Sequence, residues 1–387
     1  MSRATLVVFV DALGARQLEE LGGGGRLPYT RPLRGILGYS CAALPSLLTG
    51  RPQSAHGRMC LFAKAERDGA SVLAPLSWLG LLPAVVHERA VVRRLLARGL
   101  RRWAGLEGYV DLYRVPPDAF RWLDLPERED LFSSDEIGGQ PTFLSRARHA
   151  GLTVFSARWQ LPEDERWQEA EAALGARPPE LAFLYATAVD GALHRDGNGA
   201  PSVRAAFDRT LARIERAARL MRAGGRDVTL LVVGDHGMAD VTRVIDPRPF
   251  APPSGVRHFV DSTMLRLWGD GASLDRARAA IERLRWPGRW LDADALASRG
   301  APTGDRFGQL VFLLDEGGIF APSFLGGAVR GMHGYDVGCS SAASFVASDA
   351  PLPAHVTALD EIAPFVEARL GLPERTTSQG ERHVAPA

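Results

Sequence analysis

Three largely apolar runs, each closely followed by an acidic residue, constrain the fold of this chain most strongly. The runs are Thr5–Val10, Leu181–Tyr185 and Val228–Val233. Strands of a parallel sheet have such a composition, because both of their faces are covered. Helical patterns lie between the runs, as in folds that alternate strands with helices. The sequence therefore predicts an α/β fold with a mostly parallel central sheet and helices on both of its faces.

The residues that follow these runs combine carboxylates with imidazoles. They are Asp11 after the first run, Asp190 and His194 after the second, and Asp235 and His236 after the third. Ligands of open α/β sheets bind beyond the carboxyl ends of the strands. Asp and His side chains supply the oxygen and nitrogen ligands of a zinc-type site. For the last pair, the alternative is an Asp that caps the next helix beside a His that only fills space.

Two loops could bring further functional groups to the same edge. Ser40 directly precedes a short apolar helix that ends at Gly50, and His333 lies in a glycine-flanked loop. A hydroxyl at a helix N-terminus loses its proton more easily, although serine there most often only caps the helix. The six Asp and His residues divide into two sets of three. This matches two metal ions about 3.5–4 Å apart that clamp an in-line displacement at phosphorus.

The order of these motifs resembles the alkaline phosphatase superfamily, and within it the nucleotide pyrophosphatase/phosphodiesterase branch. The residues that carry the resemblance are Asp11, Ser40, Ser46–Gly50, Ala55–Gly57, Asp190–His194, Asp235–Met238, His333–Asp336, and Asp360–Pro364 with Leu370–Pro373. The resemblance covers nearly the whole chain except residues 58–138. It implies one alkaline-phosphatase-like catalytic domain over residues 1–387.

The resemblance also implies a two-zinc site and a serine nucleophile. One zinc ion would bind Asp190, His194 and His333. The other would bind Asp11, Asp235, His236 and the oxygen of Ser40. Manganese or iron is the alternative metal for this ligand set. The implied activity is hydrolysis of phosphodiester or pyrophosphate bonds through a phosphoserine intermediate. Two alternatives stay open: a phosphomonoesterase or phosphotransferase on the same metals, and a metal-binding relative without turnover.

One position departs from the pattern of the branch. The branch has an asparagine three residues after the nucleophile, where it donates to a phosphoryl oxygen, and this chain has Ala43. Loss of such a donor can lower the rate by ~10²–10³. One hypothesis is that an arginine of residues 58–138 replaces it. The departure favours the alternative without turnover, and the complete set of metal ligands argues against that alternative.

Two segments are predicted to lie outside the regular α/β alternation. Residues 58–138 are expected to form a helical cap insertion that selects a substrate with an apolar or anionic group. Within it, His87–Leu106 has apolar residues at helical spacing and arginines on the other side. We expect an ordinary surface helix there, with contact to a membrane as the less favoured alternative. Residues 240–330 are predicted to form a small α+β subdomain, and Gln379–Ala387 a disordered tail.

Net charge and composition indicate which kinds of partner the chain can bind. A formal net charge of +1 gives no indication of a nucleic-acid polymer as partner, so a small-molecule phosphate ester is expected. No apolar run approaches the roughly 18–20 residues that cross a bilayer. The N-terminal residues lack the pattern of a signal peptide, and the three cysteines form no close pairs. We therefore expect a cytoplasmic protein, and the sequence leaves its oligomeric state open.

Overall fold

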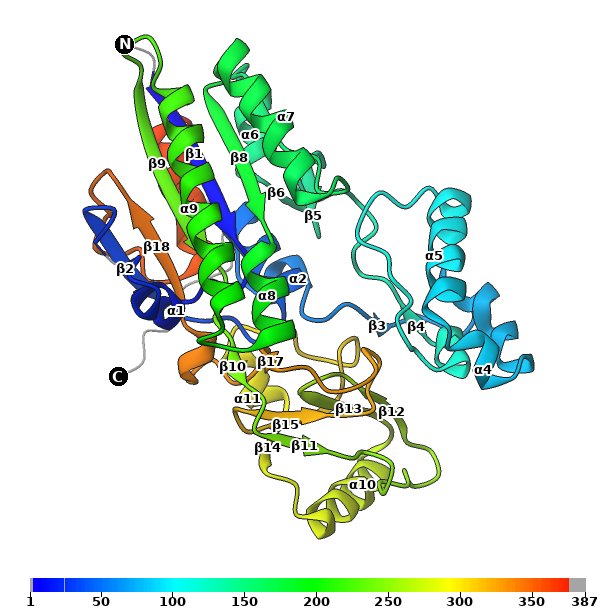
Figure 1. Cartoon of the computed structure of the whole chain (residues 1–387). Helices are drawn as coiled ribbons and strands as arrows, with labels where there is room; N and C mark the ends of the chain where they lie inside the picture. The colour runs from blue at the N-terminus through cyan, green and yellow to red at the C-terminus, as the bar shows by residue number, and fades with distance from the viewer. Residues whose placement is uncertain (1–2, 24, 376–387) are drawn as a thin grey trace.

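The computed structural model describes residues 3–23 and 25–375, and its centre is a six-stranded sheet in the order β2-β18-β9-β1-β8-β7 (Figure 1). The strands are β1 (Arg3–Val10), β2 (Tyr29–Leu33), β7 (Val154–Ser156), β8 (Leu181–Ala186), β9 (Asp227–Gly234) and β18 (Ser344–Ser348). β1 pairs in parallel with both β8 and β9, while β18 runs antiparallel to its neighbours. The three predicted strands are therefore adjacent, and their carboxyl ends meet at one edge.

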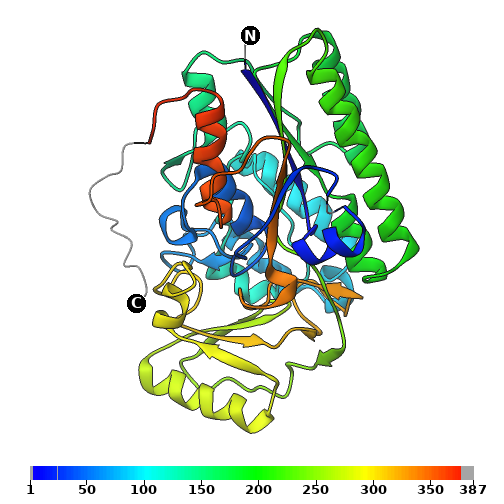
Figure 2. The same cartoon turned by 90° about the vertical axis from the view of Figure 1, so that its left-hand side faces the viewer.

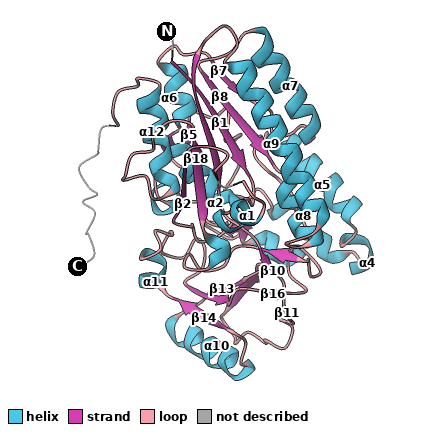
Figure 3. Cartoon of the chain, turned by 60° about the vertical axis from the view of Figure 1, so that its left-hand side comes forward, coloured by secondary structure: helices cyan, strands magenta, loops and turns pink. Residues whose placement is uncertain are grey.

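Helices cover both faces of this sheet, as predicted. They are α1 (Ala15–Glu20), α7 (Glu163–Ala176), α8 (Ala188–Asp196) and α9 (Pro201–Met221) on one face, and α2 (Ser40–Thr49), α6 (Phe143–His149) and α12 (Ile362–Arg369) on the other. Side chains of β1 alternate between the two cores, since Leu6 and Val8 pack with the first group and Val7 and Phe9 with the second. Figures 2 and 3 show α12 and α9 on opposite sides of the strands.

A smaller antiparallel sheet lies below the main sheet in Figure 1. Its order is β12-β13-β15-β14, from β12 (Arg257–Val260), β13 (Met264–Trp268), β14 (Gly288–Leu291) and β15 (Leu310–Leu314). Helix α10 (Gly271–Leu284) packs on it through Ala277 and Ile281. The remaining elements around it are β10 (Ala239–Asp240), β11 (Arg243–Ile245), α11 (Ala293–Ala297), β16 (Gly318–Phe320) and β17 (Gly331–Met332). The predicted α+β pattern is present here, and the boundaries 240 and 330 stay predictions.

A fully buried ion pair joins this sheet to residues 58–138. The Nε of Arg266 donates to Oδ2 of Asp261 at 2.5 Å, and its Nη1 donates to the carbonyl of Phe62 at 2.9 Å. Loss of one partner leaves the other charge buried without compensation, at a cost of about 3–5 kcal/mol. We therefore expect Arg266→Ala to lower the free energy of unfolding by that amount in a urea titration.

The control for this prediction is an ion pair at the surface of α10. Arg278 lies 3.2 Å from Glu282, and both side chains are about half exposed. An exposed pair of this kind contributes about 0–1 kcal/mol, so Arg278→Ala should unfold at nearly the wild-type urea concentration. Equal unfolding midpoints for the two variants would contradict a stabilising role for the buried pair.

Residues 58–138 form a separate layer beside the main sheet, at the right of Figure 1. The elements in and next to it are α3 (Gln53–His56), β3 (Ala63–Lys64), the 3-10 helices η1 (Ala74–Leu81) and η2 (Pro117–Arg121), α4 (Ala84–His87), α5 (Ala90–Ala104), β4 (Leu123–Asp124), β5 (Glu136–Ile137) and β6 (Gln140–Pro141). Their core includes Leu79, Leu100 and Phe120, and it is continuous with Phe259 and Trp268 of the smaller sheet. The predicted tail Gln379–Ala387 lies outside the described residues. In the described part of the chain, no helix is long and apolar enough to cross a membrane.

The predicted helix within His87–Leu106 is present as the shorter α5, and the apolar side chains at helical spacing do not coincide with the face that it buries. The structure buries Arg93, Ala97 and Leu100, and it exposes Val91 and Leu95. Arg93 is 2% exposed because its guanidinium has partners inside the layer. It donates to the carbonyls of His87 and Val115 and lies over the ring of Phe120. These contacts come from elsewhere in the fold, and helical periodicity cannot indicate them.

Candidate active site

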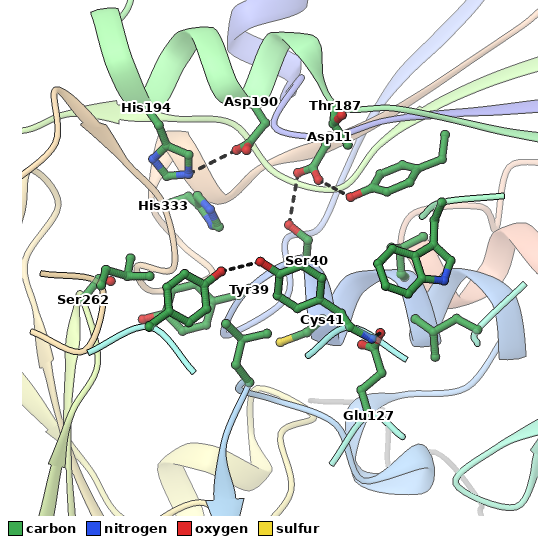
Figure 4. A pocket seen from close by; sticks show the side chains of 18 of the residues that line it. Asp11, Tyr39, Ser40, Cys41, Glu127, Thr187, Asp190, His194, Ser262 and His333 are labelled. Atoms are coloured by element: carbon green, nitrogen blue, oxygen red, sulfur yellow. Dashed lines mark hydrogen bonds and ion pairs between the residues drawn. The ribbon is translucent and has the colours of Figure 1, made fainter. Parts of the chain in front are cut away.

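The carboxyl ends of β1, β8 and β9, together with the loop after β17, bring all six predicted Asp and His side chains together. They form one group of Asp190, His194 and His333, and another of Asp11, Asp235 and His236. Within each group the potential ligand atoms lie within 4.8 Å of one another. Figure 4 shows Asp190, His194 and His333 above Ser40, with Asp11 beside them. The predicted residues therefore lie in two sets of three, and their binding of metal stays a prediction.

The local backbone explains how each group is assembled. Asp190 and His194 lie one turn apart on α8, and the loop after β17 brings in His333. Asp11 and Asp235 directly follow β1 and β9, which pair along their whole length. Ala12 adopts a left-handed conformation with φ of 56°, and its N–H donates to Oδ1 of Asp235 at 3.0 Å. This strained residue thus connects the two strand ends.

Ser40 lies at the first position of α2 and contacts one of the two groups. Its Oγ donates to Oδ1 of Asp11 at 3.1 Å and lies 3.0 Å from Nε2 of His236. The N-cap of α2 is Tyr39, and the helix has no side-chain cap hydrogen bond. The alternative of Ser40 as a plain helix cap is therefore wrong. The hydroxyl points instead to the carboxylate and imidazole that were predicted to share its metal.

The electrostatics of the site reflect crowded carboxylates. Burial raises the pKa of Asp11 well above its usual value, and the nearby charges of Asp235 and Asp190 raise it further. Burial lowers the pKa of His236, but the charge and hydrogen bond of Asp235, together with the charges of Asp11 and Asp190, raise that pKa to about 9. Burial and the charges of His236 and His194 hold the pKa of His333 well below its usual value. Such crowding of negative charge is favourable only beside cations.

Several buried ligand atoms lack hydrogen bonds. They are Oδ1 of Asp190, Oδ2 of Asp235 and Nδ1 of His333. The other two imidazoles are held by backbone carbonyls, since Nδ1 of His194 lies 2.8 Å from the carbonyl of Gly331 and Nδ1 of His236 lies 3.0 Å from that of Gly237. The Nε2 atoms face the carboxylates of their own groups, since Nε2 of His194 lies 3.2 Å from Oδ1 of Asp190 and Nε2 of His236 lies 3.1 Å from Oδ2 of Asp235. Nδ1 of His333 has no hydrogen-bond partner, and the carboxylates and imidazoles converge on one another, so the donor set fits two divalent cations.

A cavity of about 390 Å³ opens next to Ser40. Most of its wall is aromatic or aliphatic, and the aromatic lining residues are Tyr39, Tyr109, Tyr113, Phe132, Trp159, Tyr185 and Phe324. Sequence reasoning missed these side chains, because they come from several separate segments and share no motif. Glu127 also lines the cavity, and burial raises its pKa to about 7.

The structure contradicts the hypothesis that an arginine replaces the missing asparagine. None of the described residues that line the cavity is an arginine. Arg93 is bound to backbone carbonyls, and Arg94 and Arg98 are exposed on α5. Ala43 itself is 2% exposed and packs in the core on the α2 side of the sheet. Therefore no described arginine of residues 58–138 replaces the missing asparagine as a hydrogen-bond donor in this cavity.

The fold and the paired acid–histidine groups around a serine define a class, the metal-dependent hydrolases of phosphate esters. The family model of type I phosphodiesterase / nucleotide pyrophosphatase matches residues 103–336, more than half of the chain. The chain belongs to this family and is a phosphodiesterase-like hydrolase, as the motifs predicted. No curated protein sequence matches the chain.

Solved structures with the same fold include ectonucleotide pyrophosphatase/phosphodiesterase 5 from two mammals. The murine protein has a TM-score of 0.68 and 14% identity over 96% of this chain and 95% of that chain. An inactive murine variant in complex with AMP has a TM-score of 0.67 and 14% identity over 96% of each chain. The human protein has a TM-score of 0.64 and 13% identity over 97% of each chain. At such identities the likeness shows the fold, and the predicted α/β class is confirmed.

Proposed function

We propose that the chain cleaves phosphodiester or pyrophosphate bonds with Ser40 as the nucleophile. The position of Oγ between Asp11 and His236, at the edge of the cavity, carries this proposal. Oγ would give its proton to Asp11 and form a bond to phosphorus as the bond to the leaving oxygen breaks, giving a phosphoserine that still carries the remaining substituent of the substrate. Water would then attack the phosphoserine and restore the hydroxyl. No described arginine or lysine lines the cavity, so stabilisation of the phosphoryl oxygens depends on bound cations and backbone N–H groups.

We further propose that the two acid–histidine groups hold two zinc ions, with manganese or iron as the alternative metal. When bound, such a pair supplies the positive charge that stabilises the attacking and leaving oxygens. The side chains around them have separate tasks. Tyr185 donates its hydroxyl to Oδ2 of Asp11 at 2.6 Å and so fixes the carboxylate that accepts the hydrogen bond from Ser40. His333 stacks on His236 with ring centroids 3.8 Å apart, which places the two groups side by side.

The cavity wall favours a substrate whose non-reacting part is planar or apolar. Aromatic rings can stack on such a group, whereas Glu127 and the lack of arginine among the described lining residues argue against an anionic charge in this non-reacting part. The murine structure in complex with AMP makes a nucleotide the first substrate to test. A cytoplasmic location, expected from the sequence, stays a prediction.

A comparison of two chromogenic substrates tests the proposed activity. We expect the zinc-loaded protein to hydrolyse bis-p-nitrophenyl phosphate with at least tenfold higher kcat/KM than p-nitrophenyl phosphate, a difference of about 1.4 kcal/mol in activation free energy. The aromatic cavity can hold the second aryl group of the diester. A preference for the monoester would favour the phosphomonoesterase alternative. Two bound ions without turnover of either substrate would favour a relative that only binds metal.

A further inference from the structure

The exposed hydrophobic side chains of this protein are concentrated on one part of residues 58–138. Ten large hydrophobic residues are exposed in the described chain, and seven of them lie between Trp78 and Trp103. They are Trp78, Leu81, Val85, Val86, Val91, Leu95 and Trp103. None of the seven lines the cavity at Ser40. We call the surface formed by η1, α4 and α5 the cap ridge. Figure 1 shows α4 and α5 at the side of the molecule away from the main sheet.

The exposed face of α5 carries two parallel stripes. Val91, Leu95 and Trp103 are 63%, 60% and 72% exposed, and they lie at multiples of four residues along the helix. Residues four apart are neighbours on a helix surface, so these three form a continuous apolar stripe with Gly99 in it. The second stripe consists of Arg94, Arg98 and Arg102, which have the same spacing and are all exposed. In the part of the chain that the structure describes, none of these arginines forms an ion pair with an acidic side chain.

Exposed apolar side chains also lie on α4 and at the end of η1. Leu81 is 87% exposed and Val85 is 66% exposed. The Nε of Arg93 donates to the carbonyl of His87 at 2.5 Å, which fixes the end of α4 to the buried side of α5. The ridge is also strongly basic, since residues 84–104 contain six arginines and a single acidic residue, Glu88. A concentration of exposed apolar side chains on one part of a surface marks an interaction site.

We propose that the cap ridge docks on an anionic lipid surface, a function separate from the proposed hydrolysis. Apolar side chains beside arginines suit the boundary between acyl chains and headgroups, where arginines meet lipid phosphates and tryptophan has both an apolar and a polar environment. A second copy of the chain suits the ridge less well. In a symmetric contact between two ridges, Arg94, Arg98 and Arg102 of one copy would face the same arginines of the other copy. The like charges would repel each other, because no acidic side chain of the described residues is paired with them.

The test is co-sedimentation of the full-length protein with vesicles. We expect the protein to bind vesicles that contain phosphatidylglycerol, to bind vesicles of phosphatidylcholine alone at least tenfold more weakly, and to dissociate as salt is raised. Arg98→Glu with Arg102→Glu should reduce binding at least tenfold, and so should Leu95→Ser with Trp103→Ser. Both pairs change only exposed side chains, so thermal unfolding should stay close to wild type.

The matched control places the same charge change on α9. Arg209 and Arg219 are exposed there, and Arg209→Glu with Arg219→Glu should leave binding nearly unchanged. Turnover of bis-p-nitrophenyl phosphate should be equal in all these variants, so failure of the docking proposal and failure of the proposed hydrolysis are distinguishable. Failure of the wild-type protein to co-sediment with anionic vesicles would overturn the proposal. A dimer that the Leu95→Ser and Trp103→Ser changes abolish, without any vesicle binding, would assign the ridge to a second copy.

Discussion

Ser40→Ala is expected to lower kcat for bis-p-nitrophenyl phosphate by about 10³-fold or more, the size of effect found when a catalytic nucleophile is removed. The Oγ of Ser40 is the hydroxyl that lies at the edge of the cavity within hydrogen-bond distance of both Asp11 and His236. The variant should fold normally, because Tyr39 is the N-cap of α2 and Ser40 makes no capping bond. Loss of one hydrogen bond should cost about 1 kcal/mol of stability.

The matched control is the next residue in the chain. Cys41 lines the same cavity, and its thiol donates to the carbonyl of Met59 and not to the acid–histidine groups. Cys41→Ala should therefore retain turnover within a few-fold of wild type. Acid quenching of the wild-type reaction with a radiolabelled diester should trap label on the peptide that contains Ser40. Near-normal turnover in Ser40→Ala, or label on a different peptide, would rule out this nucleophile.

The sheet and the acid–histidine groups could be predicted because their signals are local. A strand buried on both faces must be apolar over its whole length, so Thr5–Val10 and Val228–Val233 are recognisable without tertiary information. Asp11 and Asp235 directly follow those strands, and parallel pairing of β1 with β9 brings the two carboxylates together. The position of the site then follows from the topology of the sheet.

The cavity wall and the orientation of α5 could not be predicted, because both depend on contacts between distant segments. Tyr109, Trp159 and Phe324 meet only in the folded chain, and no spacing connects them. In α5, arginine would normally be the exposed residue. Arg93 is buried because the carbonyl of Val115 and the ring of Phe120 lie against it, and this turns Leu95 toward solvent. Contacts with distant segments, and not the hydrophobic pattern of the helix, therefore determine which face of α5 is buried.

Removal of the metals is expected to inactivate the protein and lower its thermal stability. Without cations, the closely spaced carboxylates of Asp11, Asp190 and Asp235 repel one another, and Nδ1 of His333 has no hydrogen-bond partner. A ligand that binds only the folded state stabilises it by about 4 kcal/mol when present at a thousand times its Kd. We therefore expect dialysis against a chelator to abolish turnover and lower Tm by several degrees, and zinc to restore both.

Single-residue variants should separate the two proposed metal positions. Elemental analysis is expected to find two ions per chain in the wild-type protein and one in Asp235→Ala or His333→Ala, because each residue belongs to a different group. His149→Ala serves as the control, since His149 is exposed on α6 near Asp135 and should leave both ions in place. Active wild-type protein that holds fewer than two ions would contradict the two-metal proposal. Loss of both ions from each variant would instead mean that the stacked rings of His236 and His333 couple the two positions, so that neither group binds metal alone.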